Sequence, residues 1–431
     1  MKTEQRYFVD SRRAALVAVL SVCACAQIPR LDTPITTDYR IGLYEQWVAR
    51  DPHDISSRDR LAAAYIQKTR ETSDFGYLDR ASKIVDQILA EKKDYEALRL
   101  RNLIELNRHN FSKVAEYARE MTGSAPLDPQ NWGTLGDALM EMGRYDEARD
   151  AFQKMLDIRR GLFSLNRMAY YRFVTGDADG AIAMMTDAVK SGAPYPENKA
   201  WCLVELGNMY FKTGRWNEAE QAFHQAIALF PASHAAFAAL GSVQAAQGQV
   251  AAAIESYSKA QSITPMPQYA AALHDLYLAS GRKADAQRQA DMIDLVAKLE
   301  AASNFKANRT LALIFANQDR RLGDSLELAQ TDLQVRGDIY TYDAFAWALF
   351  KSKRYGEAQT ASQQALKMGT PEALFYYHAG MIARALGDQM GAITHLRRAL
   401  ELNAGFDIRQ AAIARTALAV ISGEETKTAG H

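Results

Sequence analysis

Apolar and small side chains recur along the chain at intervals of three and four residues, the spacing that gathers them on one face of a helix. Within residues 200–233 the positions that follow this spacing are Leu203, Leu206, Gly207, Tyr210, Ala219, Phe223, Ala226 and Pro231. Gly214 separates the two runs, and glycine easily adopts the left-handed backbone conformation of a turn. The pattern therefore predicts two antiparallel helices joined at Gly214.

The same arrangement returns with a period of about 34 residues. Clear copies occupy 129–161, 200–233, 234–267, 339–372 and 373–406, and weaker copies occupy 162–194, 267–300 and 305–338. Residues 58–94 and 95–127 fit only if an insertion is placed around Glu71–Tyr77. One helical pair cannot bury its own apolar face, so the pairs are expected to stack into a solenoid.

This unit resembles the tetratricopeptide repeat, because the quoted residues of 200–233 occupy nearly every signature position of that family. The resemblance implies an all-α, right-handed superhelical solenoid of about nine or ten antiparallel helix pairs with a C-terminal capping helix. Positions 8 and 20 of each unit, Gly207 and Ala219 here, are expected where the two helix backbones approach most closely. A left-handed turn is expected at Gly143, Gly176, Gly214, Gly248, Gly281 and Gly387.

The repeats divide the chain into seven segments. The expected boundaries are 1–26 for a signal peptide, 27–57 for a linker and a first helix, 58–127 for divergent helical pairs, 129–300 for a central array, 301–406 for a C-terminal array, 407–421 for a capping helix and 422–431 for a disordered tail. The exposed polar face of the capping helix is expected to carry Arg409, Gln410 and Arg415.

The N-terminus differs from the repeats. Arg12 and Arg13 precede an apolar run over 14–26, which is shorter than the roughly 20 residues that span a bilayer but suits the core of an export signal. Two cleavage modes remain open: Ala24–Ala26 resembles a signal-peptidase site, and Val22–Cys25 resembles a bacterial lipobox in which Cys25 would be lipidated. A buried first helix is the alternative. Export, to the periplasm or as a membrane-anchored lipoprotein, is the expectation.

Charge and cysteine content limit the kinds of partner and of covalent link that the protein is expected to have. Lys plus Arg and Asp plus Glu both number 51, so the formal net charge is zero and no basic stripe for nucleic acid is predicted. The chain contains 3 cysteines, and removal of the signal leaves Cys202, with Cys25 if it is lipidated. No disulfide is then expected, so packing alone must hold the fold. The membrane is expected to be reached only through a lipid at Cys25.

No motif for catalysis or for a cofactor stands out. The sequence lacks H-E-x-x-H, G-x-S-x-G, P-loop and G-x-G-x-x-G patterns, and its 8 histidines fall in different units without metal-ligand spacing. Cys202 has no neighbouring acid–base partner and is expected to be a packed core thiol. The sequence therefore predicts no enzyme, no metal and no cofactor.

Recognition must then come from a surface, and in the tetratricopeptide family the inner face of the superhelix binds partners. Carried over by position in the unit, the resemblance assigns to this groove Asp137, Met140, Phe163, Tyr170, Phe173, Trp201, Asn208, Phe211, Lys212, Trp347, Phe350 and Tyr377. The aromatic side chains would anchor apolar groups of a protein or peptide, and Asn208 would bond its backbone. Alternatively, the aromatics pack against the next helix, and Asn208 is merely solvated.

The sequence thus predicts a scaffold or assembly factor of the bacterial envelope that binds proteins or peptides. The rival hypothesis is a component that handles a small molecule or cofactor in the groove, with Trp347, Phe350, Tyr377 and Met381 as its site.

Overall fold

A computed structural model describes residues 36–193, 195–302 and 308–423, and every regular element in these ranges is a helix. The first eleven are α1 (Thr37–Arg50), α2 (Ile55–Thr72), α3 (Phe75–Glu91), α4 (Tyr95–Asn107), α5 (Phe111–Ser124), α6 (Pro129–Glu141), α7 (Tyr145–Ile158), α8 (Leu162–Val174), α9 (Ala178–Lys190), α10 (Pro196–Lys212) and α11 (Trp216–Leu229). The others are α12 (His234–Ala246), α13 (Val250–Ile263), α14 (Pro267–Ala279), α15 (Lys283–Ala302), α16 (Arg309–Asn317), α17 (Leu322–Val335), α18 (Ile339–Lys351), α19 (Tyr355–Leu366), α20 (Ala373–Ala385), α21 (Gln389–Leu402) and α22 (Gln410–Ser422). The proposed signal peptide, Cys25 and residues 424–431 lie outside the described ranges.

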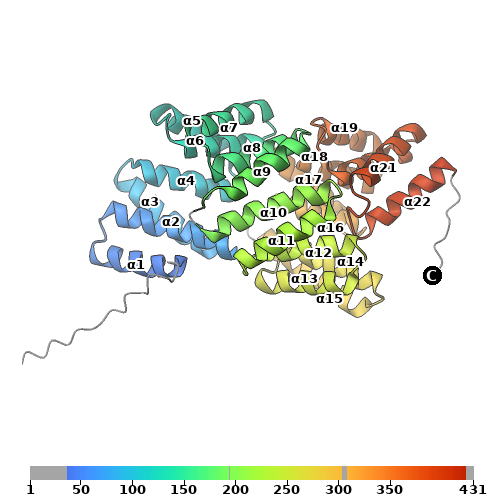
Figure 1. The fold of residues 1–431 in the computed structure, drawn as a ribbon, viewed down its shortest axis with the longest axis horizontal. Helices are drawn as coiled ribbons and strands as arrows, with labels where there is room; N and C mark the ends of the chain where they lie inside the picture. The colour runs from blue at the N-terminus through green and yellow to red at the C-terminus, as the bar shows by residue number, and fades with distance from the viewer. Residues whose placement is uncertain (1–35, 194, 303–307, 424–431) are drawn as a thin grey trace, which may run out of the picture.

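The helices pack in consecutive pairs, α2 with α3 through α20 with α21, with α1 before and α22 after them. Figure 1 shows α1–α4 at one end of the long axis and α19–α22 at the other. The prediction of an all-helical repeat solenoid is confirmed.

Local sequence explains where the helices begin. Pro129 stands in the first turn of α6, where its missing N–H removes no helical hydrogen bond. The Asp128 carboxylate accepts a hydrogen bond from the Gln130 N–H at 2.9 Å and so caps the helix. Pro196 and Pro267 likewise stand in the first turns of α10 and α14, but the residue before each of them, Tyr195 or Met266, makes no capping hydrogen bond through its side chain.

The glycine at position 8 makes room for a ring rather than for a backbone, which corrects the expectation from the sequence. A Cβ atom on Gly207 would lie 2.3 Å from a ring carbon of Phe223, which is 1% exposed. A Cβ atom on Gly136 would overlap the Phe152 ring in the same way. In these two pairs the glycine on the first helix therefore admits the large residue at position 24 of the unit, on the second helix.

The turn glycines adopt the predicted conformation. All six have positive φ, from 69° at Gly143 to 91° at Gly176. Other units place a non-glycine residue in the corresponding turn, and Lys353, between α18 and α19, has a φ of 62°. A side chain in this region costs about 1–2 kcal/mol.

Lys353→Gly is therefore expected to stabilise the protein by about 1 kcal/mol, since relief of the left-handed strain exceeds the added freedom of the unfolded chain. Urea unfolding followed by circular dichroism measures the change. Ser352→Gly is the control, because Ser352 has a φ of −83° and should gain nothing. An unchanged or lower midpoint for Lys353→Gly would contradict the strain.

Near the N-terminus, two long helices account for the extra length that the sequence placed around Glu71–Tyr77. Helices α2 and α3 contain 18 and 17 residues, and only Ser73 and Asp74 separate them. Ser73 makes the turn in the left-handed conformation, with a φ of 57°.

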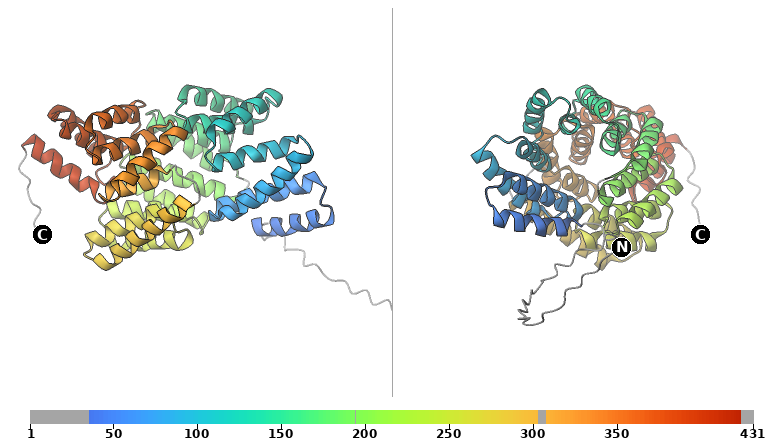
Figure 2. Two further views of the ribbon diagram at one scale, coloured as in Figure 1. Left: turned by 180° about the vertical axis from the view of Figure 1, so that it is seen from behind. Right: turned by 60° about the vertical axis from the view of Figure 1, so that its left-hand side comes forward.

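Successive turns of the superhelix touch each other. The Gly337 N–H donates to the Glu141 carbonyl at 3.0 Å, and the Asn403 side-chain amide donates to the Phe211 carbonyl at 2.9 Å. Such partners are 192 to 196 residues apart in sequence. Figure 2, in its right-hand view, shows the helices arranged in a ring around a common axis. One turn of the superhelix thus takes fewer than six repeats and rests directly on the next turn.

The terminal helix α22 differs from its predicted orientation. Gln410 is buried at 5% exposure and does not lie on an outer polar face, and the Arg409 guanidinium faces Asp275 at 3.5 Å. Arg415 is exposed, but it shares the outer side with Ile413 and Val420, which are 41% and 63% exposed.

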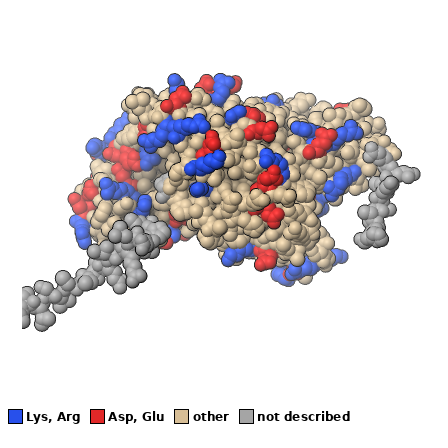
Figure 3. All heavy atoms as spheres, viewed as in Figure 1, with Lys and Arg blue, Asp and Glu red and all other residues tan. Residues whose placement is uncertain are grey.

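The outer surface carries mixed charge. On the face in Figure 3, basic and acidic side chains are interspersed and separated by broad uncharged areas. Among the described helices, none is both long and apolar enough to cross a bilayer.

Candidate functional site

The interior of the superhelix contains two large hollows. The first, here called the N-terminal lumen, has a volume of about 720 Å³ and is lined by side chains of α2–α8 and α10 together with Arg336. The second, the C-terminal lumen, has a volume of about 470 Å³ and lies among α10–α14, α16 and the segment that leads into α22. Both volumes fall in the range of ligand-binding sites.

Aromatic side chains line the N-terminal lumen. Trp201 of α10 and Phe75 of α3 are 42% and 58% exposed, although both face this hollow. Phe163 and Tyr170 of α8 and Met140 of α6 complete an apolar lining. Large apolar side chains left exposed inside a concave wall are typical of binding sites.

Most charges around this lumen are paired. The Arg167 guanidinium donates hydrogen bonds to both oxygens of the Asp137 carboxylate, the shortest of them 2.8 Å long. The Arg336 guanidinium forms an ion pair with the Glu141 carboxylate at 3.2 Å. Arg70 likewise pairs with a carboxylate of α10, that of Glu197 at 3.3 Å. These ion pairs hold the charged side chains around the lumen in place, but they do not include every charged group of its lining.

Glu205 is the exception. Its carboxylate faces the lumen from α10, makes no ion pair among the described residues and accepts one long hydrogen bond, from the Asn208 side-chain amide at 3.4 Å. Protein surrounds the carboxylate, and this desolvation raises the pKa of Glu205 in spite of the opposing field of Lys212. Glu205 was missed from the sequence, and the available signal was its spacing of four residues from Trp201.

Lys212 and Phe173 lie between the two turns and not on an open groove. The Lys212 ammonium pairs with Glu372 of the next turn at 2.6 Å, and it lies over the Phe173 and Tyr340 rings. Phe173 is only 2% exposed. Burial opposes the charge of Lys212, but Glu372 outweighs it and raises the lysine pKa.

A second polar cluster lies at the junction between turns, on α16–α18. The Arg309 guanidinium donates to both Asp338 carboxylate oxygens at 2.7 and 2.8 Å, and the Arg309 N–H donates to Asp332 at 3.2 Å. Arg336 joins Asp332 at 3.4 Å to Glu141 of the preceding turn. Arg336 therefore connects this cluster to the preceding turn, and the Arg309 contacts join neighbouring repeats within one turn.

The aromatic cluster of the C-terminal array is core. Trp347 and Tyr377 are each 2% exposed, Phe350 stacks on Trp347 with centroids 4.7 Å apart, and the Trp347 indole N–H donates to Asn317. The hollow beside this cluster measures about 30 Å³, room for about two water molecules at most. These three residues, predicted to face a partner or a small molecule, are instead packed.

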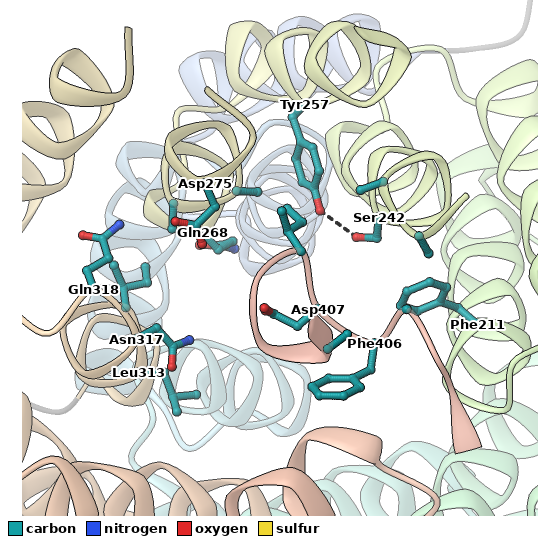
Figure 4. A pocket seen from close by; sticks show the side chains of 18 of the residues that line it. Phe211, Ser242, Tyr257, Gln268, Asp275, Leu313, Asn317, Gln318, Phe406 and Asp407 are labelled. Carbon is teal, nitrogen blue, oxygen red and sulfur yellow. Dashed lines mark hydrogen bonds between the residues drawn. The ribbon is translucent and has the colours of Figure 1, made fainter. Parts of the chain in front are cut away.

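The chain itself enters the C-terminal lumen. Figure 4 shows Phe406 and Asp407 on the segment before α22, in the middle of a ring of helices that includes Phe211, Tyr257 and Asp275. Asn403 anchors this segment by accepting a hydrogen bond from the Trp216 indole N–H at 3.0 Å. The inner face of this half is therefore partly occupied by residues of the same protein.

The predicted groove residues consequently separate into three groups. The N-terminal lumen brings together Asp137, Met140, Phe163, Tyr170 and Trp201. Phe211 lines the C-terminal lumen, and Asn208 lies beside Glu205. The remaining residues, held in contacts inside the protein, are Phe173, Lys212, Trp347, Phe350 and Tyr377.

The described residues contain no group of three or more His, Cys, Asp or Glu side chains placed to hold a metal ion. Cys202 is fully buried, and burial raises its pKa to about 11, so the thiol is protonated and unreactive at neutral pH.

Comparison with known proteins agrees with the repeat pattern. Two family models, both described as tetratricopeptide repeat, match residues 204–266 with 344–420 and residues 129–161. No curated protein matches the sequence significantly.

Several solved structures are similar. A crystal structure of MamA is 24% identical over 39% of this chain and 97% of its own, with a TM-score of 0.33. The Cut9–Hcn1 hetero-tetramer of the APC/C is 13% identical over 89% of this chain and 93% of its own, with a TM-score of 0.38. A dimer of human IFIT1 with PPP-AAAA is 11% identical over 86% of this chain and 96% of its own, with a TM-score of 0.46.

Proposed function

Since the chain belongs to the tetratricopeptide-repeat superfamily, whose members serve in general as protein-interaction scaffolds, we propose that it is a non-enzymatic scaffold that binds a segment of a partner protein in the N-terminal lumen. The observation that carries this proposal is the exposure of Trp201 and Phe75 inside a hollow of about 720 Å³. Contact between these apolar rings and water is unfavourable, so an apolar group of a partner that displaces the water would gain binding free energy.

The rest of the inner face supports this location. The C-terminal lumen holds the segment with Phe406 and Asp407, and the Trp347 cluster leaves about 30 Å³ beside it. A small-molecule site at that cluster would need the core to open. The N-terminal lumen needs no such rearrangement.

Trp201→Ala combined with Phe75→Ala is expected to weaken partner binding by about 30-fold or more, because aromatic anchors in enclosed sites contribute at least about 2 kcal/mol. Peptides selected from a phage-displayed random library on the wild-type protein provide the ligand, and fluorescence polarisation gives Kd. Phe211→Ala, in the C-terminal lumen, is the control and should leave Kd within about twofold. Equal losses for the two variants would place binding elsewhere.

For the location in the cell, the proposal is a role in the bacterial envelope, with export directed by residues 1–26 and anchoring by a lipid on Cys25. The apolar run behind Arg12 and Arg13 supports export, and the lipobox-like residues before Cys25 support the anchor.

Cys25→Ser is expected to move the protein from the membrane fraction to the soluble periplasmic fraction, because the acyl chains supply the membrane affinity. Fractionation of the native host, with metabolic labelling by a fatty-acid analogue, measures this. A wild-type protein that is soluble and begins at Gln27 would instead support cleavage after Ala26, and a cytoplasmic protein would refute export.

A further inference from the structure

We infer that the segment received by the N-terminal lumen presents a lysine or arginine side chain, with its cation held between the Trp201 ring and the Glu205 carboxylate. This inference rests on the proposed function, because it specifies the chemistry of the partner at the same site.

The two groups stand side by side on one wall. Trp201 and Glu205 are four residues apart on α10, and residues at this spacing are neighbours on a helix face. Both line the lumen, and Trp201 is 42% exposed there. An indole face with a carboxylate one helical turn further on attracts a cation through both the ring electrons and the charge.

Charge complementarity points to a cation. The other two carboxylates of the lining, Asp137 and Glu141, are neutralised by Arg167 and Arg336. The nearby ammonium of Lys212 is held by Glu372 at 2.6 Å and does not pair with Glu205. Glu205 is therefore the carboxylate of this lining that makes no ion pair among the described residues, although Lys212 lies near enough for its field to act on it.

Leaving that carboxylate in place is costly for the free protein. A partly buried carboxylate with one long hydrogen bond is poorly compensated, and a bound cation would supply the missing partner. The raised pKa of Glu205, caused chiefly by desolvation, agrees with this need.

The rest of the lumen suits the remainder of such a side chain. Lysine and arginine carry an apolar stem behind the charge, and Phe163, Tyr170 and Met140 provide apolar surface in the same hollow. An acidic partner residue would meet Glu205 with like charge, and a neutral apolar one would leave it unpaired.

The test uses a phage-displayed library of random peptides, selected separately on wild-type protein, on Glu205→Gln and on Glu255→Gln. Glu255 is an exposed residue of α13 and serves as the matched control. Peptides enriched on wild type are then synthesised with and without each basic residue replaced by norleucine, and Kd is measured with these three proteins and with Trp201→Ala. Circular dichroism verifies that each variant is folded.

The inference predicts enrichment of a basic residue on wild type and on Glu255→Gln. Replacing this residue by norleucine should weaken binding by about tenfold or more with those two proteins, but by less than about twofold with Glu205→Gln.

Two outcomes would overturn it in distinguishable ways. Peptides that lose affinity with Trp201→Ala but bind equally with lysine and norleucine would refute the cation and leave the proposed function intact. Peptides indifferent to Trp201→Ala, or no enriched peptides, would refute both.

Discussion

Gly207→Leu is expected to lower the free energy of unfolding by about 3 kcal/mol, because overpacking at a closed contact forces neighbouring groups apart. Even the first added carbon would lie 2.3 Å from the Phe223 ring, and that ring is 1% exposed and has no free space to enter. Urea unfolding followed by circular dichroism measures this loss of stability. Unfolding of the variant should start at α10 and α11, because each repeat is stabilised mainly by its immediate neighbours.

Two further variants separate this mechanism from a general effect of leucine. Adding Phe223→Ala to Gly207→Leu should recover part of the loss, since the two side chains compete for one space. Gly356→Leu is the matched control, because a Cβ there would meet nothing within 4 Å. Wild-type stability of Gly207→Leu would refute the packing of position 8 against position 24.

Arg309→Met is expected to cost about 3–5 kcal/mol, since removal of one partner of a buried ion pair leaves the other charge uncompensated. Asp338 is buried, with 5% of its surface accessible to solvent. Without the Arg309 guanidinium, its carboxylate would be repelled by those of Asp332 and Glu141. Arg144→Met is the control, because the pair between Arg144 and Glu147 is solvent-exposed and should contribute at most about 1 kcal/mol.

The loss caused by Arg309→Met should shrink on acidification. Burial raises the pKa of Glu141 and Asp332, so the folded protein binds protons at these groups more readily than the unfolded chain does. Between the raised folded pKa and the ordinary unfolded pKa, stability from these groups rises as pH falls. Urea unfolding at pH 7 and pH 5 tests this, and an equal loss at both values would argue against carboxylate repulsion.

The features that sequence could predict are local ones. The glycine at 214 and the small residue at 207 serve contacts within one helix pair, and the family pattern records them directly. The left-handed turns followed from the properties of glycine alone.

Contacts between turns could not be predicted in this way. Lys212 occupies a position that faces a groove only if the superhelix is open, and its actual partner, Glu372 of the next turn, depends on how tightly the superhelix closes. Closure is the sum of small rotations between repeats, and no single residue encodes it. The spacing of four residues from Trp201 could have pointed to Glu205, but only the packed structure shows that its carboxylate makes no ion pair among the described residues.

The central claim is that successive turns touch, so that the N-terminal lumen is left as the open recognition surface. Zero-length carbodiimide crosslinking tests it most directly, because it joins an amine and a carboxylate only when they are in contact. The account predicts a link between Lys212 and Glu372, which are 2.6 Å apart, within single molecules in a mixture of isotopically light and heavy protein. Formation of the exposed reference link between Lys93 and Glu120, 2.7 Å apart, without any link from Lys212 to Glu372 would contradict it.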